Sequence, residues 1–303
     1  MQIPAELTRW TTVAAAILAF APVLAFGFCG AGLIGRVRIL PTAVQLTLPA
    51  LLCLPYLLAT LPLGPPGPTG GFRWDWFTLY ALLPVAVAAS LLLVVKLDPD
   101  QRGHWLEFMV LLALGLAVDL RWFEGAWPHR LVFMNKMLLL DAGLYGFRCM
   151  RGLTGVGFDL RLHWSDWKIG LRELAYCTPI AVTLGLVLGF LHWQPHIERP
   201  WMIPLAWLFT FFFIALPEEI YFRGWMQNLL ERRLGRTAAL LITAAIFGLS
   251  HFNKRTAFFN WRYALLAAIA GVFYGRAWRA ERRIAASAIT HATVDTLWGA
   301  LLR

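Results

Sequence analysis

The chain has 303 residues, of which 59% are hydrophobic and only 15% are charged, and its mean hydropathy is +0.62. A soluble domain carries about 25% charged residues, so this composition excludes a soluble cytosolic enzyme, a disordered chain and a disulfide-stapled secreted scaffold. The net charge of +10 would suggest nucleic acid for a soluble protein. In a membrane protein it indicates basic loops held at an anionic leaflet.

Three long uncharged segments open the chain. They run from Trp10 to Gly35, from Ile39 to Phe72 and from Trp76 to Val95. About 20 apolar residues cross a bilayer as a helix, because lipid offers no partner for backbone polar groups. Each segment is therefore predicted to be a membrane-spanning helix. The first exceeds the apolar run of about 7–15 residues in a signal peptide, and we expect it to be retained.

Seven further apolar segments follow, and they contain more polar residues than the first three. They lie at about 105–122, 130–149, 170–191, 202–230, 237–252, 261–279 and 284–302. The predicted fold is an all-α polytopic transmembrane bundle of about eight to ten spans. We divide it into an N-terminal region of about six spans over residues 1–199 and a core over residues 200–303.

The basic residues are unevenly distributed between alternate loops. One set of loops holds 16 of them and the other holds 9. Lys and Arg concentrate on the cytoplasmic side of membrane proteins, so we expect the first set to be cytoplasmic and the protein to lie in a bacterial inner membrane. The basic residues form no continuous stripe, which argues against a nucleic-acid partner.

Two adjacent carboxylates, Glu218 and Glu219, interrupt the segment at 202–230. Ionisable groups inside a membrane are costly and indicate function by default. Glu219 and Arg223 are four residues apart, so they share a helix face and can form an ion pair. Glu218 is rotated by about 100° from Glu219 and is predicted to be a free carboxylate. A helix over about 201–230 exceeds a membrane core of roughly 30 Å, so it must tilt, protrude or kink, and Pro217 lies where a kink would expose Glu218. The competing interpretation is a set of interfacial residues at a helix end.

Two histidine clusters follow at helical spacing. Phe247 precedes His251 by four residues, and His291 precedes Asp295 by four. A lone histidine on an apolar helix is more often a core residue than a catalyst. Counted from the predicted cytoplasmic boundary, however, Glu218 and His251 lie about 21 Å deep, His291 about 12 Å and Asp295 about 18 Å. Three helices therefore place carboxylates and imidazoles in one slab of the membrane.

A carboxylate and an imidazole around one water molecule form a general acid–base pair. A second imidazole could donate a hydrogen bond to the oxyanion of a tetrahedral intermediate, which describes peptide-bond hydrolysis. The same residue types bind zinc. The sequence lacks the HExxH motif, which excludes a simple zincin helix but not a ligand set assembled from three helices. The cofactor is therefore none or zinc, and the ligands would be Glu218, His251 and His291.

These clusters resemble the three motifs of the CPBP family (CAAX protease and bacteriocin-processing, or Abi) of intramembrane endopeptidases. The motifs are Glu-Glu-x-x-x-Arg, Phe-x-x-x-His and His-x-x-x-Asn/Asp, and the resemblance covers residues 200–300. It implies a glutamate-dependent endopeptidase whose cavity opens to the cytoplasm. The implied partner is a membrane-associated protein or peptide, cleaved by CAAX-box or C-terminal-tail processing.

The resemblance also implies roles for single residues. Glu218 with His251 would activate the attacking water, and His291 with the residue at 295 would stabilise the oxyanion. The supporting residues would be Glu219, Arg223 and Phe247. The prenyl-protein proteases of the family have Asn where this chain has Asp295. An ionised Asp cannot donate to an oxyanion, so it would orient His291 or join a metal shell instead.

Two other functions remain compatible with the sequence. A buried Glu/His relay also suits a proton-coupled transporter, for which Lys136 and Asp141 in the segment at 130–149 are the best support. The chain could also be a non-catalytic membrane partner that kept the fold of a protease.

Overall fold

A computed structural model describes residues 9–64, 71–195, 200–254 and 259–302. The described residues form helices and no strand, which confirms the predicted all-α fold. The chain divides into two compact units, Met1–Leu153 and Thr154–Arg303. Backbone contacts thus divide the chain at 153/154, whereas the sequence-based division is at 199/200. The division by contacts places the helix after residue 163 in the same unit as the three motifs.

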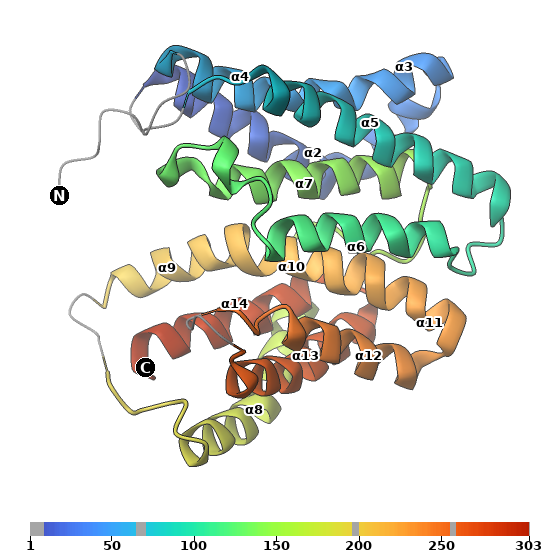
Figure 1. Cartoon of the computed structure of the whole chain (residues 1–303). Coiled ribbons are helices and arrows are strands. Elements are labelled where there is room, and N and C mark those ends of the chain that lie inside the picture. The colour runs from blue at the N-terminus through green and yellow to red at the C-terminus, as the bar shows by residue number, and fades with distance from the viewer. Residues whose placement is uncertain (1–8, 65–70, 196–199, 255–258, 303) are drawn as a thin grey trace. The chain divides into compact units, whose positions relative to one another are not determined.

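The first unit contains the helices that are coloured blue to green in Figure 1. In chain order they are α2 (Trp10–Arg38), α3 (Thr42–Thr47), η1 (Leu48–Cys53), α4 (Leu54–Thr60), η2 (Leu61–Leu63), α5 (Trp74–Leu97), α6 (Trp105–Asp119), η3 (Glu124–Ala126), η4 (His129–Leu131), α7 (Phe133–Leu144) and η5 (Tyr145–Met150). Elements α3 to η2 follow one another as one apolar segment, Thr42–Leu63. Its alternation of α and 3-10 turns coincides with Pro49, Pro55 and Pro62, which cannot donate backbone hydrogen bonds.

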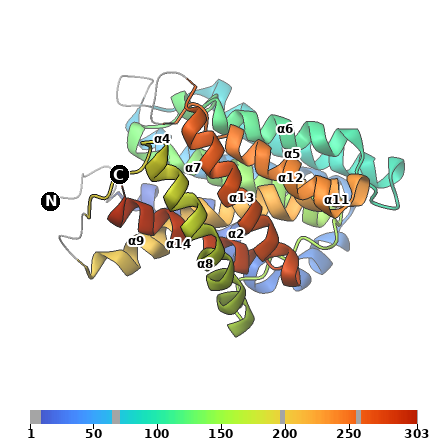
Figure 2. The ribbon, with the colours of Figure 1, turned by 90° about the horizontal axis from the view of Figure 1, so that it is seen from below.

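The second unit is coloured yellow-green to red in Figure 1. Its helices are α8 (Trp164–Val187), α9 (Met202–Thr210), η6 (Phe211–Ala215), α10 (Leu216–Glu219), η7 (Ile220–Gln227), α11 (Asn228–Leu234), α12 (Arg236–Leu249), α13 (Trp261–Glu281) and α14 (Ile284–Leu301). Helix α13 packs against α8, α12 and α14, and α8 also packs against α14 (Figure 2).

Four segments of the described chain are long and apolar enough to cross a membrane. They are Trp10–Arg38, Thr42–Leu63, Trp74–Leu97 and Met202–Leu234, and Arg236–Leu249 is a shorter apolar helix. The chain is therefore an integral membrane protein. All ten predicted segments contain helix, and membrane crossing by the other six stays a prediction.

The helix from Met202 to Leu234 has π-helical turns on both sides of Pro217. Proline cannot donate a backbone hydrogen bond, and its ring crowds the carbonyl of the preceding turn. The π-helical segments η6 and η7 flank the short α10 that contains this proline. Such wide turns are rare and are frequent at functional sites. They position Glu218 and Glu219 within a continuous helix.

Close packing of α12 on α13 sets the position of the turn after α12. A Cβ atom at Gly248 would lie 2.4 Å from the carbonyl oxygen of Ala264 and 2.7 Å from the Cβ of Ala268. Small residues at helix interfaces in membranes allow backbones to approach this closely. The absent side chain at Gly248 thus brings the end of α12, and His251 after it, against α13.

We predict that Gly248→Ala destabilises the protein by about 1–3 kcal/mol, because the added methyl group overlaps a backbone oxygen that cannot move alone. Thermal unfolding in detergent measures the effect. Gly299→Ala is the matched control, since a Cβ there meets nothing within 4 Å and alanine favours a helix. Equal melting temperatures for the two variants would contradict the packing argument.

Candidate active site

The residues of the three predicted motifs come from neighbouring elements of the second unit. They are Glu218 and Glu219 on α10, Arg223 in η7, Phe247 near the end of α12, His251 in the turn that follows, and His291 and Asp295 on α14. Helix α14 contacts both α10 and η7. This packing brings the first and third motifs together.

Glu219 is the most enclosed carboxylate of this group, with 0% of its surface exposed. Its Oε1 lies 2.8 Å from Nδ1 of His291, and its Oε2 lies 3.1 Å from Nε of Arg223. The Ser287 hydroxyl is within hydrogen-bond distance of the same Oε2 and of the Tyr274 carbonyl, and its single proton can serve only one of them at a time. The buried carboxylate of Glu219, on α10, therefore connects Arg223 in η7 with Ser287 and His291 on α14.

Arg223 is also fully buried, and it forms the i,i+4 ion pair with Glu219 that the spacing predicts. Its guanidinium donates a hydrogen bond of 3.1 Å to the carbonyl of Gly271 on α13. The guanidinium carbon lies 4.9 Å from the ring centroid of Phe247 and 5.7 Å from that of Tyr274. Aromatic faces attract a cation in this geometry, so Arg223 binds Glu219 and the aromatic residues of α12 and α13 together.

His291 lies among three carboxylates. Glu219 contacts Nδ1, and the opposite nitrogen, Nε2, lies 3.5 Å from Oδ2 of Asp295 and 3.9 Å from Oε2 of Glu218. The side chain of Glu218 is 14% exposed and that of Asp295 is 31% exposed, whereas that of His291 is 3% exposed. The imidazole thus connects the fully buried carboxylate to the two more accessible ones.

Aromatic rings hold both imidazoles in place. Tyr274 stacks on His291 with ring centroids 4.5 Å apart and an interplanar angle of 15°. The ring centroid of Phe247 lies 5.6 Å from that of His291 and 4.8 Å from that of His251, so this side chain contacts both histidines. Tyr263 meets the ring of His251 edge-on at 5.0 Å.

His251 is bound to the end of its own helix. Its Nδ1 lies 2.8 Å from the Phe247 carbonyl and 3.2 Å from the Ser250 hydroxyl. A carbonyl oxygen only accepts hydrogen bonds, so Nδ1 carries the proton that this contact needs, and in the neutral ring Nε2 then has the lone pair. His251 can therefore act as a base through Nε2.

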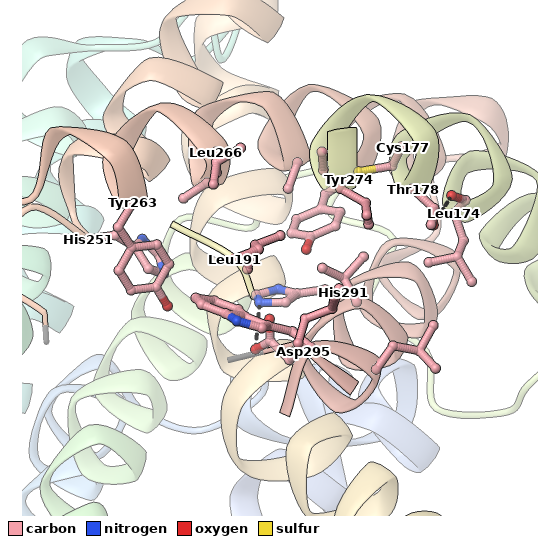
Figure 3. Close-up of a pocket in the computed structure, with 18 of the residues that line it drawn as sticks. Leu174, Cys177, Thr178, Leu191, His251, Tyr263, Leu266, Tyr274, His291 and Asp295 are labelled. Atoms are coloured by element: carbon pink, nitrogen blue, oxygen red, sulfur yellow. Dashed lines mark hydrogen bonds and ion pairs between the residues drawn. The ribbon is translucent and has the colours of Figure 1, made fainter. Parts of the chain in front are cut away.

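A cavity of about 120 Å³ lies beside the two histidines. Its polar lining includes His251, Tyr263, Tyr274, His291 and Asp295 (Figure 3), and the remaining lining residues are mostly apolar. A water molecule needs about 10–15 Å³ of such volume, so several waters fit. Glu218 is outside this lining and approaches His291 from α10.

The described residues do not fit the zinc site that the sequence left open. Among them, no group of three or more His, Cys, Asp or Glu side chains is placed to hold a metal ion. Glu218 and His291 approach each other at 3.9 Å, but His251 does not complete a ligand set with them.

Sequence reasoning missed several residues that shape this site. Ser287 precedes His291 by four residues on α14, so helical spacing alone could have placed it on the same face. No comparable sequence pattern identifies Tyr274 and Tyr263, because their contacts with the histidines depend on how α13 packs against its neighbours.

We predict that Arg223→Met lowers the free energy of unfolding by about 3–5 kcal/mol, because it leaves the charge of Glu219 uncompensated in a buried position. Thermal unfolding in detergent gives the measurement. Arg161→Met is the matched control: its side chain is 70% exposed and pairs with Asp159 at 2.8 Å, and such pairs contribute about 1 kcal/mol or less. Equal losses in the two variants would refute a structural role for the buried pair.

Comparison with models of known protein families gives a match to the last third of the chain. Residues 200–297 match the family model described as type II CAAX prenyl endopeptidase Rce1-like. Neither a curated protein nor a solved structure matches the chain significantly. The matched residues contain all three motifs and the helices that position them. Residues 200–297 are thus similar to this family, in agreement with the resemblance that the three motifs indicate.

Proposed function

We propose that the second unit is an intramembrane endopeptidase of the CAAX type, which hydrolyses a peptide bond with a water molecule activated by Glu218 and histidine. The observation that carries the proposal is the arrangement around His291. Its Nδ1 is held by Glu219, and its Nε2 lies within 3.9 Å of both Glu218 and Asp295, next to a cavity that admits water.

Each group has a definite task in this mechanism. Glu218, with His251 as a second base, takes a proton from water, and the resulting hydroxide attacks the carbonyl carbon of the substrate. The C–N bond then breaks, and the proton passes from Glu218 to the leaving amine. The products are a carboxylate and an amine.

His291 is suited to stabilise the oxyanion. Carboxylates face both of its ring nitrogens. Each carboxylate accepts a hydrogen bond from the ring when both nitrogens carry a proton. The Nε2 proton can then be donated to the oxyanion. Asp295 does not donate in this scheme. It accepts the hydrogen bond of Nε2–H before the oxyanion forms and so keeps this nitrogen protonated, and the single N–H turns to the oxyanion when that forms.

The family match and the apolar cavity support a membrane-associated substrate. We propose a protein or peptide with a prenylated C-terminal CAAX sequence, which reaches the site within the bilayer. The excess of Lys and Arg in one set of loops supports a cavity that opens to the cytoplasm, in a bacterial inner membrane.

Glu218→Gln tests the water-activating role. We expect it to slow release of the C-terminal tripeptide from a farnesylated CAAX peptide by about 10²–10⁴-fold, because the amide cannot take the proton. Chromatography of the peptide products measures the rate. Glu281→Gln, which changes an exposed carboxylate that accepts from Ser165, should leave the rate unchanged. Unimpaired cleavage by Glu218→Gln would rule out the mechanism, and a wild-type protein that cleaves no such peptide would favour a transporter or a non-catalytic partner.

Two substitutions at Asp295 distinguish the effect of its hydrogen bond to His291 from the effect of its negative charge. Asp295→Asn keeps an oxygen that accepts from Nε2 of His291, so we expect a rate within about tenfold of wild type. Asp295→Ala removes the acceptor and should slow the same cleavage by about 10²-fold, as expected for a misoriented oxyanion donor. The tripeptide-release assay compares both with wild type. Equal losses in the two variants would show that the negative charge, and not the hydrogen bond, is required.

A further inference from the structure

The first unit contains a second cavity, of about 340 Å³, which the proposed protease mechanism does not use. Its walls are formed by α2 and the segment Thr42–Leu63, and residues of α7 and η5 complete it. Ligand pockets in proteins have volumes of about 300–1,000 Å³. Twelve of its fourteen lining residues are apolar, and the polar ones are Asp141 and Tyr145.

Only one of these two polar side chains is satisfied within the described structure. The Tyr145 hydroxyl donates a hydrogen bond of 2.5 Å to the carbonyl of Gln45. Asp141 is 1% exposed, and neither of its carboxyl oxygens has a hydrogen-bond partner among the described residues. It lies near the middle of the continuous helix over residues 133–150. A buried polar group without a partner costs about 1–3 kcal/mol, and a carboxyl in a membrane span, as the sequence predicts for 130–149, indicates function by default.

The chemistry of the cavity defines what would complete it. The apolar walls suit a hydrocarbon chain, and Asp141 needs a hydrogen-bond donor. A neutral hydroxyl group supplies this donor and enters an apolar cavity at far lower cost than an ammonium group does.

The rim of the cavity supports entry from the bilayer. Three of its lining residues, Leu18, Leu51 and Leu54, are 41%, 56% and 36% exposed, on α2 and within Thr42–Leu63. Both segments are among those that are long and apolar enough to cross a membrane. An apolar chain can therefore pass from lipid into the cavity without crossing a polar surface.

We propose that the first unit binds a long-chain alcohol of the membrane, with its hydrocarbon chain between α2 and Thr42–Leu63 and its hydroxyl group donating to Asp141. This binding site is separate from the residues of the proposed peptidase, and it does not depend on peptide cleavage.

Photolabelling of the full-length protein in phosphatidylcholine nanodiscs tests the proposal. The probes are a hexadecanol with a diazirine on its chain and the same chain ended by a methyl group in place of the hydroxyl. We expect the alcohol to label residues of α2 and Thr42–Leu63, as mapped by mass spectrometry. Asp141→Leu should reduce this labelling by about tenfold, the effect of losing one hydrogen bond, and Ala21→Phe should reduce it by filling the cavity. Asp100→Leu changes an exposed carboxylate and should have no effect.

A second measurement separates binding from a structural role of Asp141. If the carboxyl serves a ligand, Asp141→Leu should raise the melting temperature of the delipidated protein, because it replaces an unpartnered polar group with an apolar one of similar size. A lower melting temperature would overturn the proposal. Equal labelling by the two probes, or unchanged labelling of Asp141→Leu, would also overturn it.

Discussion

The arrangement of the site depends on one buried carboxylate, that of Glu219. An ionised carboxylate is very costly to bury unless charged groups and hydrogen-bond donors surround it. Arg223 contributes from the same helix, and His291 and Ser287 contribute from α14. Because these partners lie on different elements, the carboxylate is satisfied only when α10, η7 and α14 pack in this way. The cost of burying the charge thus becomes a constraint on how the helices meet.

This constraint explains how two adjacent glutamates can differ in role. Glu219 is fully enclosed, whereas Glu218 stays partly exposed and approaches Nε2 of His291, on the side of the ring that Glu219 does not contact. The same hydrogen bond to Nδ1 that satisfies Glu219 turns Nε2 towards Glu218 and Asp295. The structural carboxylate therefore orients the imidazole, and the imidazole connects it to the groups that we propose for catalysis.

The sequence predicted the features that depend on local spacing. Uncharged runs predicted the helices, and the four-residue spacing predicted the pair of Glu219 and Arg223. It could not predict features that arise from packing: the π-helical turns around Pro217, and the stacking of Tyr274 on His291. The division at residue 153/154 by backbone contacts is also a product of packing, since α8 joins the second unit through its contacts with α13 and α14.

The most direct test of this account compares the thermal stability of Glu219→Gln with that of Glu218→Gln in the same detergent. The account predicts that Glu219→Gln lowers the melting temperature markedly, because Arg223 and His291 lose the charge that compensates them. Glu218→Gln should leave the melting temperature near that of wild type, because its carboxylate is partly exposed. Equal melting temperatures for the two variants, or a larger loss for Glu218→Gln, would contradict the assignment of Glu219 as the organising residue.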